Sequence, residues 1–176
     1  VNEAHHWSLR DAHDTIGVVM AFLAAYNAKK MGVKHYIAQY MFNVPPAMHH
    51  KMDLAKMLAK IELIESLEDE DFKTYRQVRA GLASLSSDLD VAKGQLAAST
   101  YLAMSIKPHI VHVVGYCEAD HAARPEEVIE STKIVRGVIR STLDGMVDMT
   151  KDAEVQQRKN ELIKEAKYLL NAIKNL

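Results

Sequence analysis

The sequence predicts an α/β protein with parallel strands, corresponding to about half of a (β/α)8 barrel. Three observations lead to this fold class. Segments with helical and strand patterns alternate along the chain, an order typical of parallel strands joined by helical crossovers. The clearest strand pattern is nearly continuous in apolar residues, as in strands covered on both faces. The chain has 176 residues, whereas a complete barrel needs about 250. A doubly wound sheet is the alternative that this alternation leaves open.

The first predicted elements are one helix and one strand. Asp11 to Met31 has apolar residues at helical spacing, and Gly32 supplies a stop signal. Val33 to Phe42 is rich in β-branched and aromatic residues and therefore predicts a strand. Asn43 to Pro46 breaks that strand.

The rest of the chain continues the alternation and ends in two helices. The predicted order is helix Met48 to Leu67, strand Gln77 to Leu85, helix Leu89 to Ile106, strand His109 to Cys117, helix Pro125 to about Leu143, and helix Asp152 to Asn175. We expect a further strand to end just before Val1. Residues 1–176 would then form one partial barrel domain, with the other half supplied by a longer parent chain, because half a barrel leaves open sheet edges.

Composition excludes several classes of partner. The formal net charge is −1, which argues against nucleic acid and against an anionic membrane surface, since both need clustered positive charge. The single cysteine, Cys117, cannot form an intramolecular disulfide. No apolar run approaches the ~18 residues of a membrane-spanning helix. A cytoplasmic location is expected.

Polar residues gather after the predicted strands, where α/β sheets and barrels place their chemistry. These residues are His5, His6 and Trp7, then Asn43, His49 and His50, then Ser84, Ser86 and Ser87, and finally Glu118, Asp120 and His121. The segments before the strands are plainer. This asymmetry predicts a site at the carboxyl ends of the strands.

Two residues are the best candidates for substrate binding. Glu118 directly follows the most apolar strand, so we expect its carboxylate to point into the barrel mouth, although it could instead cap the next helix. Arg79 lies on a weaker strand among small residues, where a guanidinium can hold a carboxylate through two hydrogen bonds. Pairing with a local acid at the surface is the alternative for Arg79.

The histidines do not form a recognisable metal motif. His5 and His6, with Trp7, could stack on a planar cofactor or bind a metal. The chain has no HExxH motif and no HxH motif at a strand end, so no metal site is predicted. Asp11, His13 and Gly17 come close to the cobalamin-ligating DxHxxG motif, but the glycine is one residue late and the segment reads as a helix.

Three segments resemble adenosylcobalamin-dependent mutases. The residues from His109 to Ile139 (HIVHVVGYCEADHAARPEEVIESTKIVRGVI) resemble a barrel strand followed by its acidic loop and helix. Glu154 to Ile173 resembles a late helix of the same barrels, and Ala38 to Leu67 narrows the resemblance to the aminomutases that also use pyridoxal phosphate.

The resemblance implies cofactors, partners and residue roles. In that family the barrel binds adenosylcobalamin against its mouth and pyridoxal 5'-phosphate inside it. By resemblance, Glu118 holds a substrate amino group, Arg79 holds the substrate carboxylate, and one of His5 and His6, with His5 favoured, stacks on the pyridine ring. The family's Schiff-base lysine and true DxHxxG motif belong to a separate cobalamin-binding Rossmann domain. That domain, the rest of the barrel and a small partner subunit are therefore implied as partners, and the chain alone should not turn over its amino-acid substrate.

Other functions remain open at this point. One is a cobalamin-dependent carbon-skeleton mutase without pyridoxal phosphate, resembling glutamate mutase. Another is a metal-dependent barrel hydrolase that uses the histidines. A third is a non-catalytic helical interaction module whose apparent strands are misread.

Overall fold

The computed structural model describes residues 12–43, 49–82 and 85–175, and it is an α/β protein with a parallel sheet. This confirms the predicted α/β class and contradicts an all-helical module. The helices are α1 (Asp14–Lys30), α2 (His50–Glu65), α3 (Leu89–Ala103), α4 (Pro125–Asp144) and α5 (Ala153–Lys174). The strands are β1 (His35–Phe42), β2 (Lys73–Ala80) and β3 (Ile110–Val111), and three short 3₁₀ helices are η3 (Met104–Ile106), η4 (Tyr116–Ala119) and η5 (Met149–Lys151).

The three strands lie side by side in chain order, β1-β2-β3, and all pairs are parallel. His35 pairs with Lys73 and Phe42 with Ala80, while β3 pairs with Gln77 and Val78 of β2. Since α2 joins β1 to β2 and α3 joins β2 to β3, both connections are helical crossovers, as the alternation predicts.

The inner helices cover one face of the sheet. Alternate residues of β1 are buried and pack against side chains from α1, α2 and α3 in one cluster: Tyr36, Ala38, Tyr40 and Phe42. Val78 of β2 and Val111 of β3 join the same cluster. Side chains of intervening residues point to the other face, and Ile37, Met41 and Ile110 there belong to none of the three buried clusters.

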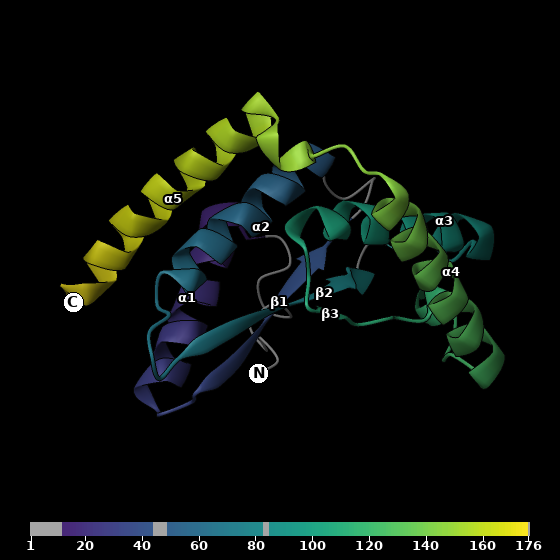
Figure 1. Cartoon of the computed structure of the whole chain (residues 1–176), viewed down its shortest axis with the longest axis horizontal. Coiled ribbons are helices and arrows are strands. Elements are labelled where there is room, and N and C mark those ends of the chain that lie inside the picture. Colours follow the sequence, from purple (N-terminus) through teal and green to yellow (C-terminus); the bar gives the residue numbers. More distant parts are fainter. Residues whose placement is uncertain (1–11, 44–48, 83–84, 176) are drawn as a thin grey trace.

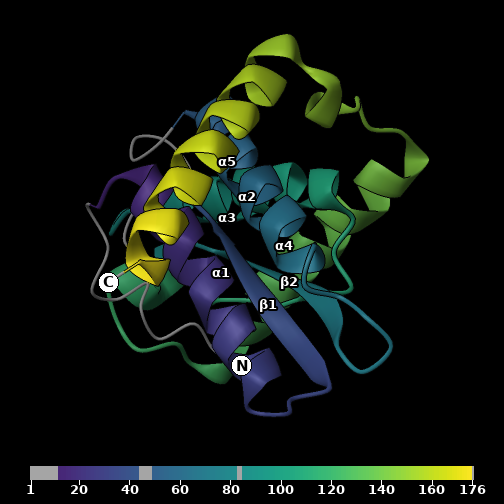
Figure 2. The ribbon, with the colours of Figure 1, turned by 90° about the vertical axis from the view of Figure 1, so that its left-hand side faces the viewer.

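Two helices form an outer layer. Helix α5 packs across α1 and α2, and α4 packs on α3 (Figures 1 and 2). The α5 contact buries Leu162, Ile163 and Ala166 against α1 and α2. Among the described residues, no helix is both long and apolar enough to cross a membrane.

Strand β2 begins and ends earlier than the predicted Gln77 to Leu85. It spans Lys73–Ala80 and begins four residues before the predicted start, because the acidic turn that precedes it sets the strand conformation already at Lys73. Asp69 accepts hydrogen bonds from the amides of Asp71 and Phe72, and Lys73 N donates to Lys34 O at 2.8 Å to open the ladder.

Strand β3 is far shorter than the predicted His109 to Cys117, and this prediction was wrong. Only Ile110–Val111 is a strand. Beyond His112, whose amide bonds Val78 O, side chains take over the backbone donors. Gly115 N donates to Glu118 Oε1 at 2.8 Å, and Tyr116 N donates to Ser131 Oγ at 3.1 Å. The expected burial is found only in part: Val114, Tyr116 and Cys117 are buried against α3 and α4, whereas Ile110 is 38% exposed.

Candidate functional site

Arg79 lies at the carboxyl end of β2, one residue before the strand ends. Its register partner is Met41 of β1, and the following chain bends at Gly81. A Cβ at Gly81 would lie 1.9 Å from Asn43 Oδ1, so a larger residue here would displace the Asn43 side chain. The structure thus places Arg79 at the sheet edge where the sequence predicts a site.

The Arg79 guanidinium is half-buried and has no acidic partner within 4 Å among the described residues. Its one hydrogen bond there is a long one from Nε to Ala80 O, at 3.4 Å. Burial lowers the pKa of Arg79, and the charge of Glu118 opposes that shift. Within the described ranges, Arg79 therefore makes no ion pair of the kind considered from the sequence.

Glu118 lies in η4, just beyond the apolar segment, and its side chain is exposed. Oε1 accepts the hydrogen bond from Gly115 N, so half of the carboxylate caps η4 itself and not the next predicted helix, α4, which Glu127 caps. No described residue donates a hydrogen bond to Oε2. The charge of Glu118 acts on Arg79 strongly enough to oppose the lowering of the Arg79 pKa by burial.

His112 joins Arg79 and Glu118 electrostatically. Its amide bonds Val78 O, which places it beside the end of β2. Burial lowers the pKa of His112, the Arg79 charge lowers it further, and Glu118 raises it. The sequence did not single out His112, because its position inside an apolar run looks like one face of a strand.

The face that carries Arg79 combines the apolar side chains Ile37, Met41 and Ile110 with polar ones. By strand alternation it also carries Gln39 and Gln77, and Gln77 Nε2 donates to Gln39 Oε1 at 3.3 Å. Tyr75 lies further toward the amino ends and contacts His35 and His109. This face therefore presents amide, imidazole and guanidinium groups, whereas the helix-covered face is apolar.

A buried carboxylate lies near the end of β1 and was not predicted. Asp53, in the first turn of α2, is fully buried, and Oδ2 accepts the Asn43 amide at 2.6 Å. Oδ1 has no hydrogen-bond partner, and its nearest cation, Lys56 Nζ, is 4.0 Å away. Burial raises the pKa of Asp53 to about 7. In the sequence, Asp53 has the pattern of an ordinary acidic residue in the first turn of a helix, so its burial could not be predicted.

The predicted cofactor residues His5 and His6 lie outside the described residues, as does Trp7. Other histidines marked by the sequence have local roles. His49 is the N-cap of α2 and accepts the Lys51 amide. His13 is the N-cap of α1, so the near-match to a cobalamin motif lies at a helix start, as its pattern indicates.

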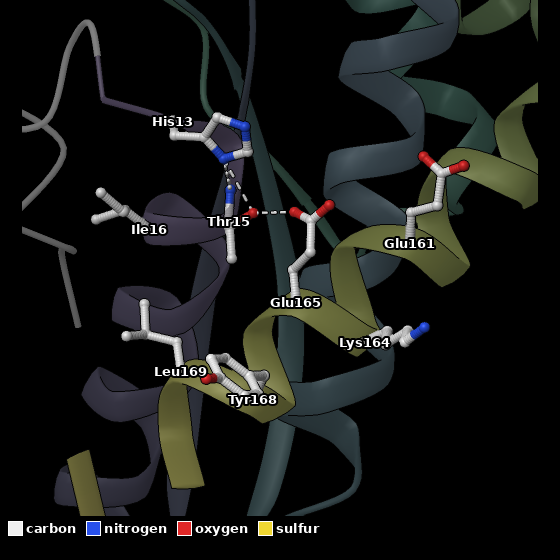
Figure 3. Close-up of a pocket in the computed structure, with 8 residues that line it drawn as sticks. All are labelled: His13, Thr15, Ile16, Glu161, Lys164, Glu165, Tyr168 and Leu169. Carbon is white, nitrogen blue, oxygen red and sulfur yellow. Dashed lines mark hydrogen bonds between the residues drawn. The ribbon is translucent and has the colours of Figure 1, made fainter. Parts of the chain in front are cut away.

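The groove between the start of α1 and α5 is a second concave feature, of about 670 Å³. Figure 3 shows His13, Thr15 and Glu165 forming a chain of hydrogen bonds across it. Arg158 Nη1 also lies 3.5 Å from Glu165 Oε1. These polar groups pair with one another and join α1 to α5, and no strand residue lines the groove. It is a helix-packing feature, distinct from the polar sheet edge.

A third group of side chains gathers where η4 meets α4. Cys117, His121 and Glu127 each offer one metal-ligand atom, and these atoms lie within 4.8 Å of one another. The common histidine motifs do not include this set, whose members come from η4, from the loop after it and from the first turn of α4. The signal was the spacing Cys-x3-His-x5-Glu.

No protein-family model matches the chain, and no curated protein matches it.

Proposed function

We propose that the chain is part of an adenosylcobalamin- and pyridoxal-phosphate-dependent aminomutase, resembling D-ornithine 4,5-aminomutase, which moves an amino group between neighbouring carbons of a diamino acid. In this proposal it is a cytoplasmic isomerase subunit, and the described sheet is about half of a (β/α)8 barrel. The remaining barrel, a cobalamin-binding Rossmann domain and a small partner subunit complete the enzyme.

The observation that carries the proposal is Arg79. A half-buried guanidinium without an acidic partner among the described residues loses hydration and gains no internal ion pair. An amino-acid carboxylate compensates that loss with two charge-assisted hydrogen bonds. Arg79 would thus hold the carboxylate end of the substrate.

Glu118 suits the other end of the same substrate. Its Oε2 has no hydrogen-bond donor among the described residues, while Oε1 is anchored on Gly115 N. A carboxylate held in this way binds an ammonium group well. Holding both ends of a diamino acid fixes the carbon between them, which lowers the entropic cost of reaching the reactive geometry.

Two features support the barrel. The strands follow one another in chain order without a reversal, and α1, α2 and α3 all pack on one face. A doubly wound sheet has helices on both faces. In a barrel, the other face lines the interior, and here that face carries Gln39, Gln77 and Arg79.

The described residues fit the substrate part of the site. When bound, adenosylcobalamin would supply the radical that abstracts hydrogen, and pyridoxal phosphate would hold the migrating amine. The residues proposed to contact the pyridine ring, His5 and His6, lie outside the described residues. The role argued for this chain is therefore to bind and orient the amino acid and to exclude water.

Electron paramagnetic resonance of the full-length protein with its partner subunit tests the proposal. The protein is mixed anaerobically with adenosylcobalamin and pyridoxal phosphate, and D-ornithine or lysine is then added. We expect a cobalt-coupled radical with one of the two diamino acids. A radical that forms without pyridoxal phosphate would indicate a carbon-skeleton mutase instead, and failure to bind either cofactor would overturn the proposal.

Two variants test the residue roles. Arg79→Met and Glu118→Gln should each raise the substrate concentration needed for half-maximal radical signal about 10- to 100-fold, since hydrogen bonds to charged groups contribute roughly 1.5–3 kcal/mol each. Arg136→Met is the matched control, because Arg136 is exposed on α4. If Arg79→Met behaves like the control, Arg79 does not hold the substrate.

A further inference from the structure

We propose that Cys117, His121 and Glu127 form a binding site for a zinc-class divalent metal ion, with Asp120 as the residue that orients His121. The site is separate from the proposed substrate residues and requires neither cobalamin nor pyridoxal phosphate.

Thiolate, imidazole and carboxylate are the protein ligands of Zn²⁺. The three ligand atoms are already within 4.8 Å of one another, and bonds of ~2.0–2.3 Å to one ion need separations of about 3.3–3.8 Å. Cys117 Sγ lies 3.5 Å from Glu127 Oε2, which is already in this range. His121 Nε2 lies 2.7 Å from Glu127 Oε1, so an ion would replace this hydrogen bond and move the two atoms slightly apart.

The imidazole is held as metal-binding histidines usually are. His121 Nδ1 lies 2.8 Å from Asp120 Oδ2, so a carboxylate accepts the Nδ1 proton and directs Nε2 toward the other ligands. Such carboxylate–histidine–metal arrangements fix the tautomer and the ring orientation. Glu127 is fixed as well, because its Oε2 accepts the Arg124 amide at 2.8 Å.

The surroundings leave one side open for the ion. Cys117 is fully buried, whereas the Glu127 and His121 side chains are 17% and 34% exposed. An ion would enter from the histidine side, and a water molecule would complete tetrahedral coordination.

Binding of a divalent ion at this site balances in charge and in protons without any further reactant. Without metal, contact with two carboxylates raises the pKa of His121, while burial and the Glu127 contact raise the pKa of Cys117. Metal binding displaces the Cys117 thiol proton, and His121 binds the ion through an unprotonated Nε2 while Nδ1 keeps its proton and donates it in a hydrogen bond to Asp120. The ion's two charges are then matched by the Cys117 thiolate and the Glu127 carboxylate.

Metal binding would also affect the neighbouring substrate residue. Cys117 and Glu118 are adjacent in η4, and Glu127 lies in the first turn of α4. An ion shared by Cys117 and Glu127 would tie η4 to α4 and so fix the backbone that carries Glu118.

The test uses Co²⁺ and Zn²⁺ with the full-length protein prepared without cobalamin. Titration with Co²⁺ should give the thiolate-to-cobalt charge-transfer band and the intense d–d bands of tetrahedral cobalt, saturating at one equivalent. Zn²⁺ should displace this signal and release the Cys117 thiol proton in weakly buffered solution. Weak octahedral Co²⁺ spectra, or no release of protons, would overturn the proposal.

Variants separate ligands from structural side chains. Asp120→Asn should lower Zn²⁺ affinity ~10- to 100-fold, and His121→Ala should lower it further. Cys117→Ser should remove the charge-transfer band, and circular dichroism checks its fold because Cys117 is buried. His50→Ala is the control, since His50 is exposed at the start of α2. Equal affinity of His121→Ala and His50→Ala would exclude the site.

Discussion

The buried carboxyl group of Asp53 should make the stability of the protein depend on pH. Its carboxyl is buried, Oδ1 has no hydrogen-bond partner, and burial raises its pKa from 3.8 to about 7. The folded protein therefore keeps a proton that the unfolded chain loses near pH 4. Stability from this group is present below about pH 4 and is lost as pH rises toward 7, by up to about 4 kcal/mol.

Asp53→Asn should remove this loss, because an amide does not ionise. We expect urea unfolding of the variant to show a flatter decline in stability between pH 4 and 7 than the wild type does. Asp144→Asn is the control, since Asp144 is exposed on α4. The same slope in all three proteins would mean that Asp53 is ionised in the folded state at pH 4 to 7.

Sequence reasoning located some site residues and could not locate others. The sequence pattern predicted Arg79 near the end of a strand, as the structure has it, whereas Glu118 lies in η4 beyond the short β3 and not directly after a strand. Asp53 and the Cys117 group could not be predicted, since their properties arise from burial and from contacts between different elements. The sequence shows which titratable or metal-binding side chains are present. Which of them are buried, and which lie close together, is decided by the packing of the elements.

At the scale of single elements, helices were predicted better than strands. Predicted helix ends such as Pro125 and Gly32 agree with the structure, because caps and stop signals are local. A strand depends on its neighbours. The first half of β2 carries the charged residues Lys73 and Arg76 and lies outside the predicted strand. In the structure the Arg76 guanidinium pairs with Glu65 and donates a hydrogen bond to Ile106 O.

The end of β3 shows how side chains can replace a ladder. Ser131 is fully buried on α4, and its Oγ accepts the Tyr116 amide at 3.1 Å. Ser131→Ala leaves that buried N–H without an acceptor, so we expect destabilisation of about 1–3 kcal/mol.

Chemical denaturation of Ser131→Ala and Ser141→Ala measures this cost. Ser141 lies on the same helix, is exposed, and donates only to Gly137 O, so its removal should change stability by less than about 0.5 kcal/mol. Equal stability of the two variants would show that Tyr116 N finds another acceptor.

At the scale of the whole molecule, the sequence predicts alternation but not curvature. Both an open sheet and a barrel contain βαβ units, and the sequence pattern leaves the choice open. In the structure, α1, α2 and α3 all cover the same face of the sheet, and the face with Gln39, Gln77 and Arg79 lies opposite. That asymmetry favours the barrel, whose helices all lie outside.

Because α5 packs on α1 and α2, we expect it to unfold together with them in one cooperative transition. Leu162 is fully buried in a cluster with Val18 of α1 and Leu63 of α2, while Lys159 Nζ lies 2.9 Å from Glu62 Oε2 beside it. Leu162→Ala creates a cavity between three helices, and we expect a loss of about 2–5 kcal/mol.

Thermal and urea unfolding, followed by circular dichroism, test this against Leu143→Ala, whose side chain is 77% exposed. A single transition shifted only in Leu162→Ala would place α5 within the core. Two transitions in that variant, with the early one losing helix alone, would mean that α5 detaches while the sheet and inner helices remain. The α/β core would then comprise the sheet with α1 to α4, and α5 would be dispensable for its folding.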